Sequence, residues 1–114
     1  MRDRRNYPRK YLVMIARVFD RKTGKLLGHI ADMTIEGIMI IGNLQLKANQ
    51  VYELRMELPE NIFGINSLDL IARSIWCHHD PIPTMHNTGF QLLDLSADDV
   101  AIIERILREY AINY

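Results

Sequence analysis

The feature that most constrains the fold is a series of short apolar stretches separated by turn residues. The stretches cover residues 11–19, 26–31, 38–42, 51–58, 68–77 and 89–95. They are rich in β-branched, aromatic and other apolar residues, and they are too short for typical helices. The segments between them, including residues 59–67 and 78–88, contain glycine, proline or polar residues and are predicted to be turns and loops. The pattern predicts about six short strands in an all-β fold.

Alternation within the longer stretches indicates which side chains share a face. Apolar and charged residues alternate in residues 51–58, which predicts a strand with one face toward solvent. In residues 68–77 the same alternation places Leu68, Leu70, Ala72 and Trp76 on one side. These residues are therefore expected to face the same way.

A single helix is predicted after the last strand, over residues 97–110. Ser96 and Asp99 form a start resembling a capping box, with Asp in place of the usual Glu. Apolar residues follow at helical spacing, namely Val100, Ile103, Leu107 and Tyr110. The order of elements predicts a small antiparallel barrel or a tightly curled sheet with the helix lying across it.

Length and composition predict one soluble domain. The chain has 114 residues, of which 48% are hydrophobic and 25% charged, and this suffices for one core. Its single cysteine, Cys77, excludes an internal disulfide. No apolar run is long enough to span a bilayer, and no secretory signal follows the N-terminus. We therefore expect a cytoplasmic location and no insertion into a membrane.

The N-terminal residues 1–10 form a segment of concentrated positive charge. Five basic residues stand against Asp3, a local balance of +4 in a chain whose 14 basic and 14 acidic residues cancel. Pro8 disfavours a helix, so Arg5 and Arg9 are expected to lie on an open, flexible arm. Guanidinium groups at this density are typical of phosphate and guanine recognition. The alternative is a charged, disordered terminus without a ligand. Residues 11–114 are predicted to form the folded domain.

A polar turn lies between the second and third predicted strands. Asp32, Thr34 and Gly37 are spaced as an acid, a hydroxyl and a glycine. Asp and Thr side chains close local turns by accepting hydrogen bonds from backbone N–H groups. Gly37 permits another group to come close to the backbone. The turn is either a simple hairpin connection or a device that presents a carboxylate and a hydroxyl at the barrel rim.

Together, the two motifs resemble the signature of the PilZ domain family. Arg5-x-x-x-Arg9 precedes the first strand and Asp32-x-Thr34-x-x-Gly37 follows the second, as in that family's RxxxR and [D/N]xSxxG motifs. The resemblance extends to the strand ending in Trp76 and to Gly89-Phe90. It implies a six-stranded antiparallel β-barrel with a C-terminal helix that acts as a receptor for the bacterial second messenger cyclic di-GMP. Thr34 stands where that family usually has serine, so the hydroxyl is kept and a methyl group is added at the expected pocket.

The resemblance also implies a role for each motif residue. Arg5 and Arg9 would hold phosphate oxygens and the guanine O6/N7 edge, and Arg4 would be a third cation. Asp32 would accept from a guanine N–H or orient an arginine. Thr34 would hydrogen-bond the base or the turn. Gly37 would let the backbone come close to the ligand.

The expected mechanism is an order–disorder switch. The dinucleotide would fold the arm across the barrel mouth and change the surface offered to a downstream protein partner. The sequence does not identify that partner. Dimerisation through the helix stays open, and the main rival is a barrel that binds protein but no longer binds the nucleotide.

Other site chemistries have weaker support. The run of residues 77–80, with His86 nearby, lacks CxxC or HxxxH spacing for a metal site. Nothing marks an oxyanion hole for Cys77, so we expect no enzyme activity. The neutral net charge and the lack of an aromatic row argue against a nucleic acid polymer as partner.

Overall fold

The computed structural model describes residues 10–12, 16–62 and 64–113. Strands make up most of it, with one helix near the C-terminal end. In chain order the elements are β1 (Lys10–Leu12), β2 (Arg17–Asp20), β3 (Leu26–Met33), β4 (Gly37–Gly42), β5 (Val51–Ile62), β6 (Ile65–His79), β7 (His86–Leu93), α1 (Ala97–Tyr110) and β8 (Ala111–Asn113).

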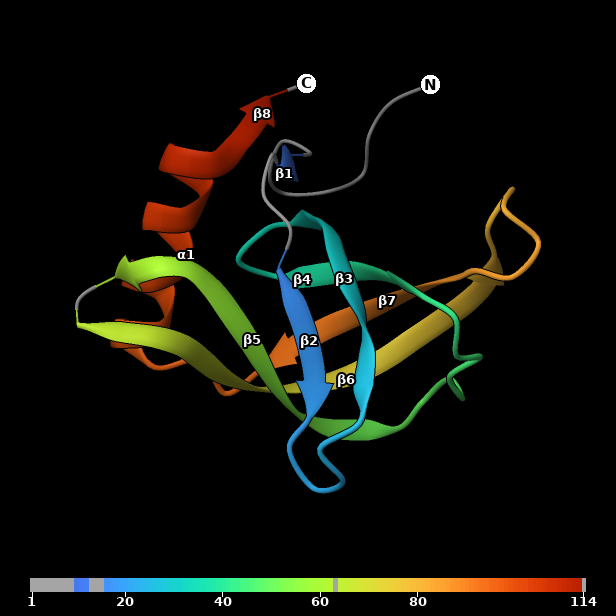
Figure 1. The fold of residues 1–114 in the computed structure, drawn as a ribbon. Coiled ribbons are helices and arrows are strands. Elements are labelled where there is room, and N and C mark those ends of the chain that lie inside the picture. The colour runs from blue at the N-terminus through green and yellow to red at the C-terminus, as the bar shows by residue number, and fades with distance from the viewer. Residues whose placement is uncertain (1–9, 13–15, 63, 114) are drawn as a thin grey trace.

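Six of the strands close into an antiparallel barrel (Figure 1). They follow one another around the ring as β2-β5-β6-β7-β4-β3, and β3 pairs again with β2 to complete it. Two short strands extend the sheet beyond this ring, since β8 pairs with β1 and β1 pairs with β3. The prediction of a six-stranded antiparallel barrel with one C-terminal helix is confirmed.

Two details of the strand prediction are wrong. The single strand expected over residues 11–19 is observed as β1 and β2, which pair with different parts of the sheet. The loop expected over residues 59–67 is instead the end of β5 and the start of β6. The loop was predicted from Pro59 onward because a proline usually ends a strand. Here it falls between Glu57 and Ile62, where the pairing register shifts and the regular ladder is interrupted.

The barrel interior and the helix share one hydrophobic core. Buried side chains from all six barrel strands form it, including Val18, Met33 and Leu54, which are fully inaccessible to solvent. The helix contributes Ile102, Ile103 and Ile106, and two further residues of the predicted stripe, Leu107 and Tyr110, pack against this core while partly buried. Burial of this face stabilises the helix against the barrel far more than helix propensity alone would.

The helix begins at the predicted cap. The backbone N–H of Asp99 donates to Ser96 Oγ at 3.0 Å, and the N–H of Ser96 donates to Asp99 Oδ2 at 3.1 Å. This reciprocal pair satisfies two otherwise unpaired donors. No helix within the described ranges is long and apolar enough to cross a membrane.

Candidate functional site

Four residues from four strands form a row across the outer wall of the barrel. Cross-strand pairing links Asp32 on β3 to Met39 on β4, Met39 to Gly89 on β7, and Gly89 to Trp76 on β6. Residues paired in this way lie roughly 4.5–5.5 Å apart between Cα atoms. The row therefore connects the acid of the polar turn with the only tryptophan of the chain.

Two β-bulges turn the ends of this row outward. The register of β3 against β4 shifts between Ile30 and Asp32, and that of β6 against β7 shifts between Ser74 and Trp76. A bulge adds one residue to a strand and so reverses the faces of all residues beyond it. Trp76 is consequently 37% exposed.

The predicted orientation of Trp76 is wrong because of the bulge in β6. Leu68, Leu70 and Ala72 are buried as expected, and the next residue of that alternation, Ser74, is also buried. Simple alternation continued through Trp76 would have placed its indole in the core. The extra residue in β6 sends it to the opposite face.

The Trp76 indole is held between neighbouring groups. A side chain at Gly89 would collide with it, since a Cβ built there would lie 2.4 Å from Trp76 Cε2 and 2.7 Å from Nε1. The His78 ring meets the indole edge-on, with centroids 5.0 Å apart and planes at 76°. Gly89 thus gives the ring room to lie close over β7, and His78 borders it.

The turn between β3 and β4 is closed by the Thr34 hydroxyl. Thr34 Oγ1 accepts from the backbone N–H of Glu36 at 3.1 Å and of Gly37 at 3.3 Å, and the Thr34 N–H donates to the Gly37 carbonyl at 2.9 Å. A Cβ at Gly37 would lie 2.4 Å from the Phe90 carbonyl oxygen, so glycine lets β4 approach β7. The extra methyl of threonine leaves this hydrogen bonding intact.

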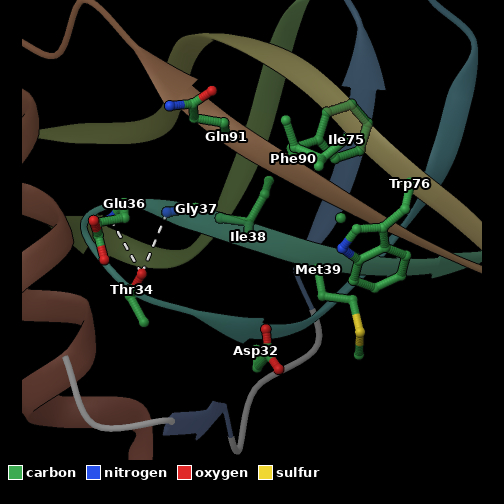
Figure 2. A pocket seen from close by; sticks show the side chains of 11 residues that line it. Asp32, Thr34, Glu36, Gly37, Ile38, Met39, Ile75, Trp76, Phe90 and Gln91 are labelled. Carbon is green, nitrogen blue, oxygen red and sulfur yellow. Dashed lines mark hydrogen bonds between the residues drawn. The ribbon is translucent and has the colours of Figure 1, made fainter. Parts of the chain in front are cut away.

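These elements line one open cavity of about 340 Å³. Figure 2 shows Thr34 and Glu36 toward one end and Trp76 and Met39 toward the other. The cavity thus has a polar end and an apolar, aromatic end. Its volume is at the lower end of the range for small-molecule sites. The full lining is Asp32, Thr34, Glu36, Gly37, Ile38, Met39, Ile75, Trp76, Gly89, Phe90 and Gln91.

The structure brings together three of the residues singled out in the sequence, namely Asp32, Thr34 and Gly37. The three predicted arginines, Arg4, Arg5 and Arg9, lie outside the described residues. Sequence reasoning missed the contributions of Met39, Ile75 and Gln91 to the cavity. Only the strand register reveals them, because each is an ordinary strand residue with no motif around it.

The cysteine and the histidines near the end of β6 make separate contacts and do not converge on one point. His79 and His86 face each other across the β6–β7 pair, with ring centroids 4.4 Å apart. His78 instead contacts Trp76, and Thr88 Oγ1 donates to Cys77 Sγ at 3.4 Å. Within the part of the chain that the structure describes, no three histidine, cysteine or acidic side chains group as metal ligands would.

Solved structures with the same architecture are found at low sequence identity. The PilZ domain of YcgR from Escherichia coli with c-di-GMP matches at a TM-score of 0.73 and 13% identity, covering 93% of this chain and 90% of that one. The Bacillus subtilis inhibitor of motility MotI/DgrA matches at 0.69 and 17%, covering 94% and 51%. MrkH of K. pneumonia in its apo state matches at 0.61 and 15%, covering 96% and 49%. The chain thus spans about half the length of the latter two proteins.

No curated protein sequence matches the chain. The family model for the PilZ domain, by contrast, matches residues 3–109, nearly the whole sequence. That span includes both motifs, every strand of the barrel and almost all of the helix. The chain therefore belongs to the PilZ domain family.

Proposed function

We propose that this PilZ domain is a receptor for cyclic di-GMP. The observation that carries the proposal is the cavity that joins Asp32 and Thr34 to the exposed face of Trp76. The structure of the YcgR PilZ domain, which shares the fold, contains c-di-GMP. The proposed activity is reception of a signal in the cytoplasm, and it involves no chemical conversion of the ligand.

The chemistry of the cavity is complementary to half of this ligand. Cyclic di-GMP presents two guanines and two phosphates around a closed ring. A guanine stacked on Trp76 would bring its N–H edge toward Asp32, which lies in the same cross-strand row. Stacking on an aromatic side chain contributes about 1–3 kcal/mol per base. The phosphates and the guanine O6/N7 edges of the ligand also require cations, and the arm would supply them.

The position of β1 supports a role for the arm. Tyr11 pairs with Asp32, and the antiparallel direction means that β1, followed back toward the N-terminus, runs toward Thr34. Arg9 is two residues before Tyr11, so its Cα lies within about 8 Å of the Tyr11 Cα in any conformation. The chain thus enters β1 next to the polar end of the cavity. We propose that Arg4, Arg5 and Arg9 close over the ligand there.

The proposed output is a change at the chain ends. β1 pairs with β3 at the cavity on one edge and with β8 on the other, where Tyr11 is the register partner of Ile112. Ordering of the arm would therefore stabilise β1 and, through it, the segment that follows α1. A downstream protein partner would read this altered surface. The rival proposal, a PilZ module that binds protein without the nucleotide, keeps the barrel and predicts no response to the ligand.

The single tryptophan provides a direct assay of the site. Titration with cyclic di-GMP is expected to change Trp76 emission to saturation, whereas GMP and GTP at equal concentration leave it unchanged. Trp76→Ala removes the stacking face and should weaken binding in calorimetry by roughly ten- to a hundredfold. Ile82→Ala, at an exposed residue that does not line the cavity, is the control and should bind normally. Equal affinity of both variants would refute the role of Trp76, and absence of any binding would favour the rival module.

The arginine motif makes a second prediction. Arg9→Ala should abolish measurable binding at micromolar ligand, because a bidentate contact to guanine contributes about 1–3 kcal/mol and the phosphate contact is lost as well. Arg5→Lys should also weaken binding, since a point charge does not replace a planar fork of donors. Lys25→Ala removes a positive charge from an exposed position next to β3 and serves as the matched control. Calorimetry in which either arginine variant behaves like Lys25→Ala would contradict the assignment.

Amide hydrogen exchange tests the proposed output. Saturating cyclic di-GMP should slow exchange in residues 2–10, because the ligand would order them, and in β8, because its pairing partner β1 would become more stable. The amides of β4 pair on both sides within the barrel and should change little. If the ligand binds but exchange in the arm and in β8 stays the same, the order–disorder mechanism is wrong while the receptor function stands.

A further inference from the structure

We propose that Arg73 is an additional ligand contact, binding a phosphodiester group from the side of the cavity opposite the arm. This inference rests on the proposed function. It assigns a role to a residue outside both sequence motifs. Two observations and the shape of the ligand lead to it: the position of Arg73 in the sheet, and the lack of an acidic partner for it among the described residues.

Arg73 belongs to a second row on the outer wall, next to the first. Cross-strand pairing links Val51 on β5 to Arg73 on β6, Arg73 to Gln91 on β7, and Gln91 to Gly37 on β4. Gln91 and Gly37 line the cavity. Arg73 is exposed and is the direct neighbour of Gln91, so its long side chain starts at the edge of the cavity.

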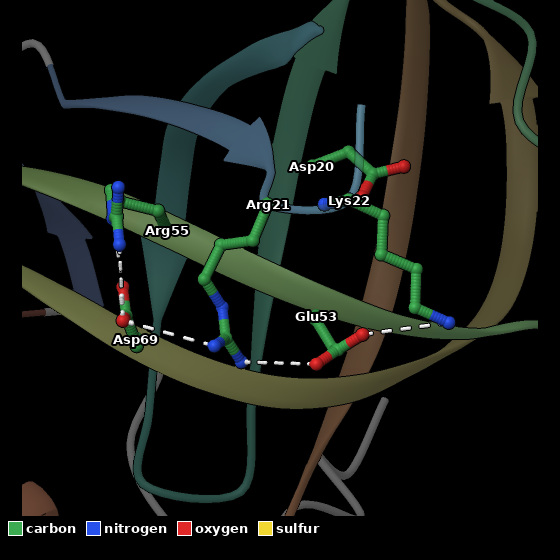
Figure 3. A network of polar contacts seen from close by, with 6 residues as sticks. All are labelled: Asp20, Arg21, Lys22, Glu53, Arg55 and Asp69. Carbon is green, nitrogen blue, oxygen red and sulfur yellow. Dashed lines mark hydrogen bonds and ion pairs between the residues drawn. The ribbon is translucent and has the colours of Figure 1, made fainter. Parts of the chain in front are cut away.

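The charge environment of Arg73 differs from that of the other arginines on the barrel. Arg17 forms a bidentate pair with Glu57 at 2.7 and 3.0 Å, and Arg55 does so with Asp69 at 2.9 and 3.3 Å. Arg21 lies between Asp69 and Glu53, at 3.8 and 4.0 Å, in the network of Figure 3. The Arg55 guanidinium lowers the pKa of Asp69, as expected for a stable ion pair.

Arg73 has no such partner among the residues that the structure describes. Its cross-strand neighbours are Gln91 and Val51, a neutral amide and an aliphatic residue. Val51 is 54% exposed and the nearby Ile75 is 45% exposed. The aliphatic stem of Arg73 can lie along such apolar groups while its guanidinium remains available to an anion.

The geometry of the ligand explains why a cation is needed on this side. The two phosphates of cyclic di-GMP lie on opposite sides of its ring, so one group of arginines cannot surround both easily. The arm is tethered beside β3, whereas Arg73 stands on β6, and β4 and β7 lie between them. A ligand stacked on Trp76 would therefore be held between the arm and Arg73.

Calorimetric titration of the full chain with cyclic di-GMP tests this proposal. Arg73→Ala should bind roughly tenfold or more weakly, as expected for the loss of a charge-assisted hydrogen bond. Arg73→Lys should retain part of the affinity because the charge remains. The control is Arg108→Ala, which removes another exposed arginine with no ion pair in the described part, at the far end of the helix. It should change the affinity less than twofold.

Salt dependence separates a phosphate contact from a structural role. The difference between wild type and Arg73→Ala should shrink as salt is raised from 50 to about 500 mM, because screening weakens the contact that only the wild type makes. A defect that persists undiminished at high salt would overturn the phosphate contact, as would an Arg73→Ala variant with wild-type affinity. If the wild type itself does not bind cyclic di-GMP, the proposed function fails. If the wild type binds and Arg73→Ala binds equally well, only the role of Arg73 fails.

Discussion

The site depends on two β-bulges that bring distant residues onto one face of the barrel. Without the register shift in β3, Asp32 would face the interior, and without that in β6, Trp76 would do so. A carboxylate in the core would be costly, and an indole there would have no role in binding. The bulges instead align both residues in one transverse row with Met39 and Gly89 between them. The candidate ligand contacts follow from this alignment.

The closed barrel makes that alignment rigid. Each strand of the ring is paired on both sides, and a continuous core fills the interior. Ser74 anchors the strand just before the second bulge, because its hydroxyl donates to the Lys47 carbonyl at 2.7 Å and accepts from the Gln50 N–H at 3.0 Å. Side chains at positions 37 and 89 would collide with the Phe90 carbonyl on β7 and with the Trp76 indole, and the glycines avoid both collisions. The cavity is therefore largely preformed, so little ordering of the barrel opposes binding.

The sequence predicted the architecture and the polar turn well. Short apolar stretches, the capping pair Ser96–Asp99 and the spacing of Asp32, Thr34 and Gly37 are local patterns, and local patterns are legible in a sequence. The orientation of Trp76 was wrong because a bulge leaves no local signal and reverses a simple alternation. The cavity neighbours Met39 and Gln91 were missed for a related reason, since pairing between strands distant in sequence decides their position. The continuation of β5 past Pro59 likewise depends on an irregular ladder.

A structure of the complex with cyclic di-GMP tests the proposed site most directly. We expect one guanine stacked on the Trp76 indole, its N–H edge within hydrogen-bond distance of the Asp32 carboxylate, and the ligand lying over Met39 and Gly89. A complex in which the dinucleotide binds elsewhere on the barrel, with Trp76 and Asp32 both untouched, would contradict the claim that this row is the binding site.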